Sequence, residues 1–417
     1  MLARVLMAAG LCVAACAAAV ADARAQDGAA GTSIVLGDEA DAAGSDERAS
    51  STNGAVIAPP PAPLESVVVE AVPPPCGLAG PDRAAAMPCS DDLDAWTILA
   101  TVDALFLERA NGVGPLAVAS QSSSTPGAPV ISASDVRYPT IPGARVFHGW
   151  RNEDSGGWEA GYLGAWSMHA DAQAVSPAGL LALPGGLGAV DGSGFGTATA
   201  IQAQLDSTLN SAEFNIFSTR LHAGCRKHDP LPWRRSWDIF DGSTARADWL
   251  LGIRWAGINE TALLSVTSWT HLPPPDVATT TYRVATSSQF VGPQVGHRRR
   301  VEWGDWAVEG WLKAALVGTI LSQSQGAVVG PADLVLVREP RSSTTGGVGM
   351  IADLNATAVR RFGDHWAVRA GYTLLWFAGS APAANQWDFT NTTTSGTRLQ
   401  TGTVFLHGAT LGVEAAW

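Results

Sequence analysis

Hydrophobic and polar residues alternate along this chain from about residue 96 onward, in segments of roughly ten to fifteen residues. A period of two places successive side chains on opposite faces of a β-strand. In the segment 364–378, one face carries His365, Arg369 and Thr373. The opposite face is apolar or aromatic throughout: Trp366, Val368, Ala370, Tyr372, Leu374 and Trp376. The pattern predicts an all-β protein.

The spacing of two tryptophans in that segment indicates where the strands lie. Trp366 and Trp376 are ten residues apart, which is roughly 33 Å along a strand. A tilt of about 40° reduces this to a height of roughly 25 Å, the thickness of the apolar band on outer-membrane barrels. We therefore expect an antiparallel, up-and-down transmembrane β-barrel. The alternative is a long strand of a soluble β-sandwich with two core tryptophans.

Similar alternation recurs in the segments 158–168, 247–257, 305–320 and 406–417. In the first of these, Trp158, Trp166 and Met168 are expected on one face. The chain ends on Trp417, in keeping with a final strand that the barrel-insertion machinery reads. Aromatic residues form girdles at both membrane interfaces of such barrels. The predicted girdle consists of Trp158, Trp166, Trp249, Trp255, Trp306, Trp366, Trp376 and Trp417.

Charged residues on the opposite faces of these segments are expected to point into the lumen. The predicted lumen-facing residues are Arg220, Arg254, Glu309, Lys313, Arg369 and Glu414. Their mixed signs allow either cross-links within a closed lumen or a charged constriction. The assignment rests on alternation alone, so a shift of one residue in register would reverse it.

Turn signals divide the barrel into strands. Tight turns are predicted at Asn152–Gly156, Ile258–Glu260, Gly304-Asp305 and Gly363-Asp364, where Gly, Asp and Asn supply the required backbone conformations. Long connections are predicted at 110–143, 171–196, 322–342 and 379–400. Short turns on one side and long loops on the other are typical of these barrels. We expect twelve strands, within a range of ten to fourteen.

The first 95 residues differ from the rest. Residues 1–25 resemble a secretory signal peptide with an Ala-x-Ala cleavage site, and Cys16 offers a lipoprotein alternative. Residues 26–95 hold twelve acidic and two basic residues, and all sixteen tryptophans lie later. Such a segment cannot bury enough apolar surface to fold, so a disordered periplasmic extension is expected. In it, Cys76 and Cys89 either form a disulfide or remain free thiols. The barrel domain is predicted at 96–417.

Candidate chemistry in the barrel domain is sparse. Most of the formal charge of −12 belongs to the extension, and the missing basic surface argues against nucleic-acid binding. His222, Cys225 and His228 resemble a metal cluster, but on a strand His222 and His228 share one face while Cys225 points to the other, so polar strand-end residues are the preferred interpretation. The basic run His297–Arg300 is interpreted as a solvated strand end, with contact to anionic lipid as the alternative. We predict no catalytic residue, no cofactor and no metal site.

Several blocks, in order, are similar to a β-barrel porin family typical of planctomycete-like bacteria. They are Ala104–Arg109, Ser211–Ile216, Trp249–Trp255 followed by Asn259-Glu260, Gly310–Ala315, Arg369–Trp376 and Leu406–Glu414. The resemblance covers roughly residues 96–417 and implies an outer-membrane barrel. It implies no particular solute and no pore-lining residues.

The leading hypothesis is an outer-membrane porin for passive diffusion of small hydrophilic solutes. The alternatives are a closed structural barrel whose loops bind a surface partner and, third, a secreted β-sandwich binding protein. The expected partners are outer-membrane lipid, the barrel-assembly machinery through the C-terminal strand, and small solutes. The sequence leaves the solute, the ion selectivity and the oligomeric state open.

Overall fold

The computed structural model describes residues 96–110, 116–121, 129–152, 156–223, 244–270, 276–332, 335–391 and 399–417. The chain divides into two units, Met1–Arg83 and Ala84–Trp417, and the described residues all belong to the second. The predictions for 1–25, for the extension 26–95 and for Cys76 and Cys89 lie outside the described residues.

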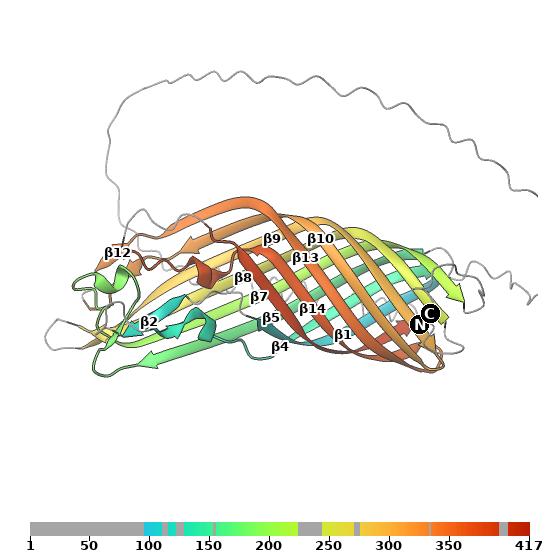
Figure 1. The fold of residues 1–417 in the computed structure, drawn as a ribbon, viewed down its shortest axis with the longest axis horizontal. Helices are drawn as coiled ribbons and strands as arrows, with labels where there is room; N and C mark the ends of the chain where they lie inside the picture. The colour runs from blue at the N-terminus through green and yellow to red at the C-terminus, as the bar shows by residue number, and fades with distance from the viewer. Residues whose placement is uncertain are drawn as a thin grey trace, which may run out of the picture. The chain divides into compact units, whose positions relative to one another are not determined.

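Ten long strands form a closed antiparallel ring (Figure 1). They are β1 (Trp96–Ala110), β4 (Ile141–Asn152), β5 (Gly156–Val175), β7 (Ala198–Ala223), β8 (Thr244–Trp269), β9 (Val277–Trp303), β10 (Trp306–Gln325), β13 (Arg341–Phe362), β14 (Trp366–Ser380) and β15 (Gly402–Ala416). Each pairs with the preceding and following long strand, and β1 closes the ring against β15. The predicted all-β, up-and-down transmembrane barrel is confirmed.

The ring has ten strands, so the expected number of twelve is wrong, and ten is the lower limit of the predicted range. The turn predicted at Ile258–Glu260 is wrong, because β8 continues through it for 26 residues. Ile258 and Glu260 both point inward there, and Glu260 forms a buried ion pair with Arg109. The polar residues that suggest a turn in the sequence are thus interior residues of one long strand.

The connections differ in length at the two ends of the ring. At one end, here the short-turn end, the turns at Gly304-Asp305 and at 363–365 join β9 to β10 and β13 to β14. Gly304 and Gly363 adopt positive φ angles of 55° and 70°, which favour glycine. At the opposite, long-loop end, segments 111–140, 176–197, 326–340 and 381–401 join the strands, as does the shorter segment 270–276 between β8 and β9. The long connections at this end therefore lie close to where the sequence predicts them. One long connection, residues 224–243 between β7 and β8, belongs to the short-turn end.

The strands run obliquely around the ring (Figure 1). A path that starts at Phe377 on β14 and follows the cross-strand backbone partners once around the ring ends at Ala416 on β15. Ala416 lies beside His365, so the path returns to β14 twelve residues away from its starting point. A stagger of this size requires strands tilted by roughly 35–45° from the barrel axis.

Side chains alternate between the exterior and the interior along every strand. On the outside of β10, Trp306, Val308, Leu312, Leu316 and Ile320 are exposed, as a lipid-facing surface requires. The prediction that Met168 shares the outer face of its strand with Trp158 and Trp166 is wrong. A β-bulge between Ala165 and Met168, with Ser167 at a φ of 58°, turns Met168 into the barrel, where it is buried.

The loops at the long-loop end contain short elements that lie within or against the barrel mouth. These are β2 (Ala117–Gln121), β3 (Pro129–Ser132), η1 (Ala133–Asp135), β6 (Leu181–Ala182), η2 (Leu187–Ala189), β11 (Val328–Val329), β12 (Leu336–Arg338) and η4 (Ala383–Gln386). None of the helices in the described part of the chain has the length and hydropathy to cross a membrane.

Candidate functional site

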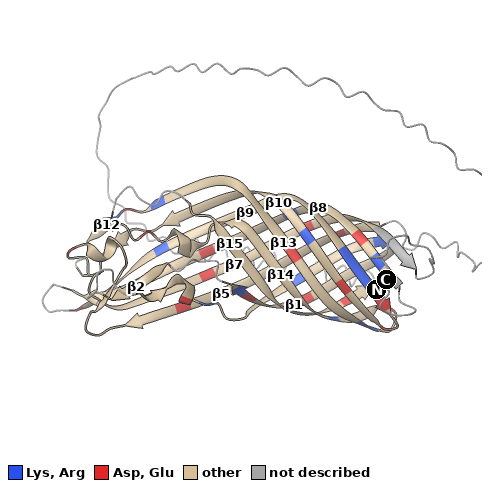
Figure 2. Cartoon of the chain, viewed as in Figure 1, with Lys and Arg blue, Asp and Glu red and all other residues tan. Residues whose placement is uncertain are grey.

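The interior of the barrel is the candidate site, and its short-turn half is filled with charged side chains. Figure 2 shows Lys, Arg, Asp and Glu crowded toward the end that carries the C-terminus. Eight basic side chains point inward there: Arg145, Arg151, Arg246, Arg254, Arg298, Arg300, Lys313 and Arg369. Eight acidic side chains accompany them: Asp103, Glu159, Glu213, Asp248, Glu302, Glu309, Asp353 and Glu414. We call these sixteen residues the ion-pair layer.

One chain of contacts crosses the ring through Arg298 on β9. Its Nη1 donates to Oε2 of Glu159 on β5 at 2.5 Å, and its Nε donates to Oδ2 of Asp248 at 2.9 Å. The same Asp248 oxygen accepts a hydrogen bond from Arg151 on β4 at 2.8 Å. The Arg298–Glu159 contact crosses the lumen, because β7 and β8 separate β5 from β9 in the ring, and the Arg151–Asp248 contact crosses it because β5 and β7 separate β4 from β8. Asp248 and Arg298 are direct partners on neighbouring strands and link the two crossing contacts.

Lys313 on β10 forms a second bridge. Its ammonium lies 2.5 Å from Oε1 of Glu213 on β7 and 3.2 Å from Oε1 of Glu159 on β5. Arg254 on β8 reaches Asp353 on β13 at 3.2 Å. None of these partners belongs to a neighbouring strand, so their pairing occupies the middle of the barrel.

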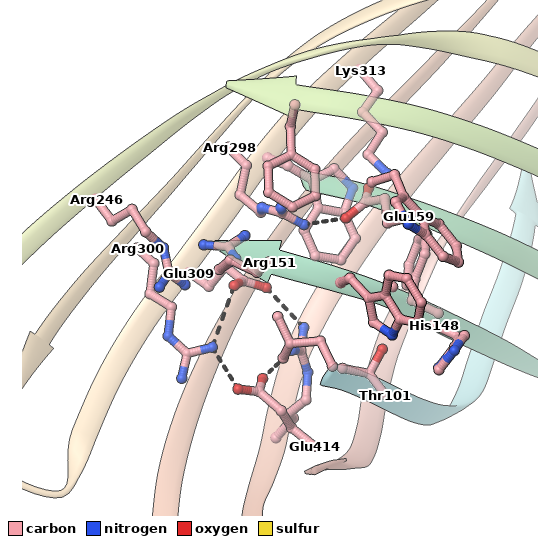
Figure 3. Close-up of a pocket in the computed structure, with 18 residues that line it drawn as sticks. Thr101, His148, Arg151, Glu159, Arg246, Arg298, Arg300, Glu309, Lys313 and Glu414 are labelled. Carbon is pink, nitrogen blue, oxygen red and sulfur yellow. Dashed lines mark hydrogen bonds and ion pairs between the residues drawn. The ribbon is translucent and has the colours of Figure 1, made fainter. Parts of the chain in front are cut away.

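A third group closes the interior near the short-turn end (Figure 3). Arg300 donates to Glu414 at 2.7 Å and lies 3.5 Å from Glu309. Arg369 donates to the same two carboxylates, at 2.6 Å to Glu414 and 3.0 Å to Glu309. Two guanidinium groups and two carboxylates thus form a closed, charge-neutral ring, which lowers the cost of burying each charge.

Aromatic rings fill the space between these ions. The guanidinium of Arg145 lies 4.7 Å from the ring centre of Trp311, and the Lys313 ammonium lies 4.6 Å from that of Phe147. Arg151 and Arg298 lie 4.8 Å and 5.0 Å from the ring of Phe217. A cavity of about 50 Å³ remains among these residues, which is room for a few water molecules.

The long-loop half of the interior is mainly apolar. Inward residues of the strands, such as Leu209, Phe290 and Phe377, form one buried cluster with residues of the loops. The loop residues in this cluster include Val118, Ile131, Leu187, Phe195, Trp387 and Phe389. We call this cluster the apolar layer. The loops therefore fill the barrel mouth rather than rest above it.

Buried polar contacts fasten the loops in place. Oε2 of Glu260 accepts a hydrogen bond from the backbone N–H of Ala383 at 2.9 Å, while Oε1 pairs with Arg109. The amide of Gln325 donates to the carbonyl of Gln386 at 3.0 Å. Tyr138 packs 4.9 Å from the Arg109 guanidinium, and its burial raises the pKa of its hydroxyl.

The predicted lumen-facing residues mostly meet in this site. Five of them lie buried in the ion-pair layer: Arg254, Glu309, Lys313, Arg369 and Glu414. The side chain of Arg220 lies outside the described residues, as do the side chains of His222, Cys225 and His228. In the rest of the described chain, no group of three or more His, Cys, Asp or Glu residues is arranged to hold a metal ion.

The interpretation of His297–Arg300 as a solvated strand end is wrong. Arg298 and Arg300 point inward and pair with carboxylates, because alternation along β9 sends every second residue of the run into the barrel. The interior aromatics Phe147, Phe217 and Trp311 were not predicted. Their signal is the same alternation, since Phe147 and Trp311 each lie two residues from an inward charge on their own strand, and Phe217 lies four residues from Glu213 on the inward face of β7.

The predicted girdle residues all lie on the outer face of the barrel. The rings of Trp366 and Trp417 are 5.7 Å apart at the short-turn end, with Trp306 at the same end. Trp376 lies ten residues further along β14, and its backbone partner on β15 is Phe405. Trp249 has the largest exposed fraction among the girdle residues, 61%.

An apolar exterior around a charged interior defines the class of this protein as a transmembrane β-barrel. The chain matches no known family model and no curated protein, so the resemblance to a porin family stays a prediction. Among solved structures it is similar to the outer membrane protease OmpT from Escherichia coli. The identity is 11% over 78% of this chain and 98% of that chain, with a TM-score of 0.39.

Two further solved structures are more distant. A deletion mutant of the TodX monoaromatic hydrocarbon channel has 9% identity over 78% of this chain and 90% of its own, with a TM-score of 0.23. A FadL homologue from Pseudomonas aeruginosa has the same identity and coverage with a TM-score of 0.19. Similarities this low carry no argument about the activity of this chain.

Proposed function

We propose that this chain is a closed outer-membrane β-barrel that presents a binding surface at its long-loop end. The observation that carries this proposal is the set of ion pairs between strands that are not neighbours in the ring. Arg298 to Glu159, Lys313 to Glu213 and Arg254 to Asp353 all cross the interior. Bridges of this kind occupy the path that a solute would take.

Passive diffusion through the barrel is disfavoured by the same packing. The cavity of about 50 Å³ within the ion-pair layer is too small for a hydrated sugar or amino acid. Opening a pore would separate several buried ion pairs, and each separated charge would cost several kcal/mol in a site without bulk water. The porin hypothesis therefore requires a second conformation with a large energetic cost.

A projecting sheet favours a surface-binding role. β7, β8 and β9 contain 26, 26 and 27 residues, whereas about 9–11 residues cross a membrane. Most outward residues of their long-loop halves are polar, apart from apolar ones such as Trp269 and Val277, and they include Gln202, Gln204, Asp206, Thr267, Thr279 and Thr281. We call this part of the sheet the projecting rim. It offers a hydrated β-surface for a macromolecular partner.

The proposal also assigns an orientation. The short-turn end faces the periplasm, together with the extension 26–95, and the projecting rim faces outward. The C-terminal strand β15 is the segment that the barrel-assembly machinery reads. Enzymatic activity is not part of the proposed function, and assays with peptide and ester substrates would test that exclusion.

Single-channel recording in planar bilayers tests the closed interior. We expect no discrete conductance from protein whose folded state is verified by heat-modifiable migration in detergent gels. Reproducible conductance steps from such a sample would overturn the proposal and restore the porin hypothesis. Membrane fractionation tests the location, since recovery of soluble monomer without detergent would exclude the membrane assignment.

A further inference from the structure

A second cavity, of about 340 Å³, lies at the long-loop end of β1. Its volume is at the lower end of the range for small-ligand sites, ~300–1,000 Å³. Its polar and charged lining consists of Glu108, Arg109, Ser134, Arg137, Tyr138 and His407. We call it the rim cavity. It is separate from the ion-pair layer and from the projecting rim.

The rim cavity spans the barrel wall. Glu108 and His407 are direct cross-strand partners on the outer faces of β1 and β15. Arg109, the next residue on β1, points inward and is buried beside Tyr138. The hydroxyl of Tyr372 shares a hydrogen bond of 2.7 Å with Nδ1 of His407, which fixes the imidazole and leaves Nε2 available. The cavity is therefore accessible from outside while one wall is interior.

Its charges are incompletely paired. Arg109 donates from Nη1 to Ser207 at 2.7 Å and from Nη2 to Glu260 at 2.5 Å, but its buried Nε has no hydrogen-bond partner within the described chain. A buried donor without a partner is unfavourable, so an acceptor that reaches this nitrogen would stabilise it. Within the same described residues, neither Glu108 nor Arg137 forms an ion pair with an oppositely charged side chain.

The position of the cavity matches a lipid headgroup. His407 lies two residues along β15 from Phe405, which pairs with the girdle residue Trp376. Below the cavity, toward the short-turn end, the outer faces of β1 and β15 expose Phe106, Val102 and Leu411. The cavity is thus at the boundary between the apolar band and water, directly above a surface that acyl chains would cover.

We propose that the rim cavity binds a zwitterionic phosphate–amine group, supplied by the headgroup of a phosphoethanolamine lipid. Arg137 and Nε of Arg109 would hold the phosphate oxygens, because guanidinium groups favour phosphate. The carboxylate of Glu108 would accept hydrogen bonds from the ammonium group. A lining that carries both a carboxylate and guanidinium groups favours a zwitterion over a simple anion. The proposal holds whether or not the interior is closed.

Native mass spectrometry of the full chain in detergent tests this binding. Phosphatidylethanolamine and phosphatidylglycerol with the same acyl chains are compared, since only the former carries an amine. We expect one retained phosphatidylethanolamine per barrel, with about tenfold weaker retention of phosphatidylglycerol. Glu108→Gln should remove this preference, whereas Arg137→Gln should weaken the retention of both lipids by about tenfold.

A comparison with soluble glycerophosphoethanolamine tests whether the phosphate–amine group comes from a lipid headgroup or from a free soluble compound. Binding of the lipid at concentrations where the soluble compound does not bind supports a lipid headgroup. Equal binding of both supports the zwitterion site but overturns the lipid assignment.

Arg283→Gln and Glu339→Gln are matched controls, since both residues are exposed at the long-loop end and do not line the cavity. Equal retention of the two lipids by the native chain, or equal effects of the cavity variants and the controls, would overturn the proposal. Heat-modifiable migration of each variant confirms its folded state, and conductance is recorded on the same samples to keep this test separate from that of the closed interior.

Discussion

The two halves of the barrel interior have opposite polarity. The short-turn half holds sixteen charged side chains, whereas the long-loop half holds one apolar cluster of strand and loop residues. The exterior has the reverse arrangement. Around the ion-pair layer the wall exposes residues such as Leu251, Leu312 and Val368, and around the apolar layer it exposes residues such as Asp206 and Thr279.

This difference shows that each half follows its own surroundings. Where lipid contacts the wall, apolar side chains face outward and the inward positions hold paired charges. Where the strands project beyond the membrane, the polar faces meet water, and the apolar faces turn inward as in a soluble β-barrel. Long strands such as β7, β8 and β9 change polarity partway along their length without a break in the backbone ladder.

The strongest test of the ion-pair layer is Lys313→Ala. The substitution leaves Glu159 and Glu213 buried without their shared ammonium partner, and we expect a loss of about 4 kcal/mol in the free energy of unfolding. Urea unfolding in detergent, followed by tryptophan fluorescence, measures it. Arg283→Ala, at an exposed position, serves as control with an expected change below about 0.5 kcal/mol. Equal midpoints for the two variants would contradict the assigned role of the ion-pair layer.

The apolar layer is tested by Trp387→Ala, which removes a buried loop side chain from the mouth. We expect a loss of about 3 kcal/mol through the cavity it leaves, with no new conductance because the ion-pair layer remains. Trp269→Ala at the exposed edge of β8 is the matched control and should cost less than about 1 kcal/mol. Conductance in the Trp387 variant would mean that the loops, not the ion pairs, close the barrel.

A double-mutant cycle compares ion pairs inside and at the end of the barrel. Arg300→Gln and Glu414→Gln, alone and together, should give a coupling energy of about 1–2 kcal/mol, since both side chains are buried. The same cycle on Arg361 and Glu302, where Arg361 is 45% exposed, should give less than about 1 kcal/mol. Couplings of similar size would show that burial does not strengthen these pairs.

The smallest effect is expected on the projecting rim. The hydroxyls of Thr267 and Thr279 share a hydrogen bond of 2.8 Å across β8 and β9. Thr279→Ala should reduce stability by about 0.5 kcal/mol, and its neighbour on the same outer face, Thr281→Ala, by less. A loss above about 2 kcal/mol in either variant would indicate that this surface is packed rather than hydrated.

Alternation alone identified much of this architecture. It predicted the all-β class, the outward tryptophans and the inward orientation of Arg254, Lys313 and Arg369. It was wrong where the backbone breaks the period, as at the bulge before Met168, and where polar interior residues imitate a turn, as at Ile258–Glu260. The two errors have different causes. At Met168 the bulge shifts the period of two through the backbone, and at Glu260 local polarity does not reveal the buried partner Arg109.

The sequence by itself determined which residues form strands and, for most of them, which face each presents, because the period of two is a local property of the chain. Only the tertiary structure decided the number of strands, the partner of each charge and the filling of the mouth by loops. Lys313 meets Glu159, 154 positions away, because ring closure and the stagger of twelve residues bring β10 and β5 across from each other. Ring closure depends on all ten strands together, so it cannot be predicted from any single segment of the chain.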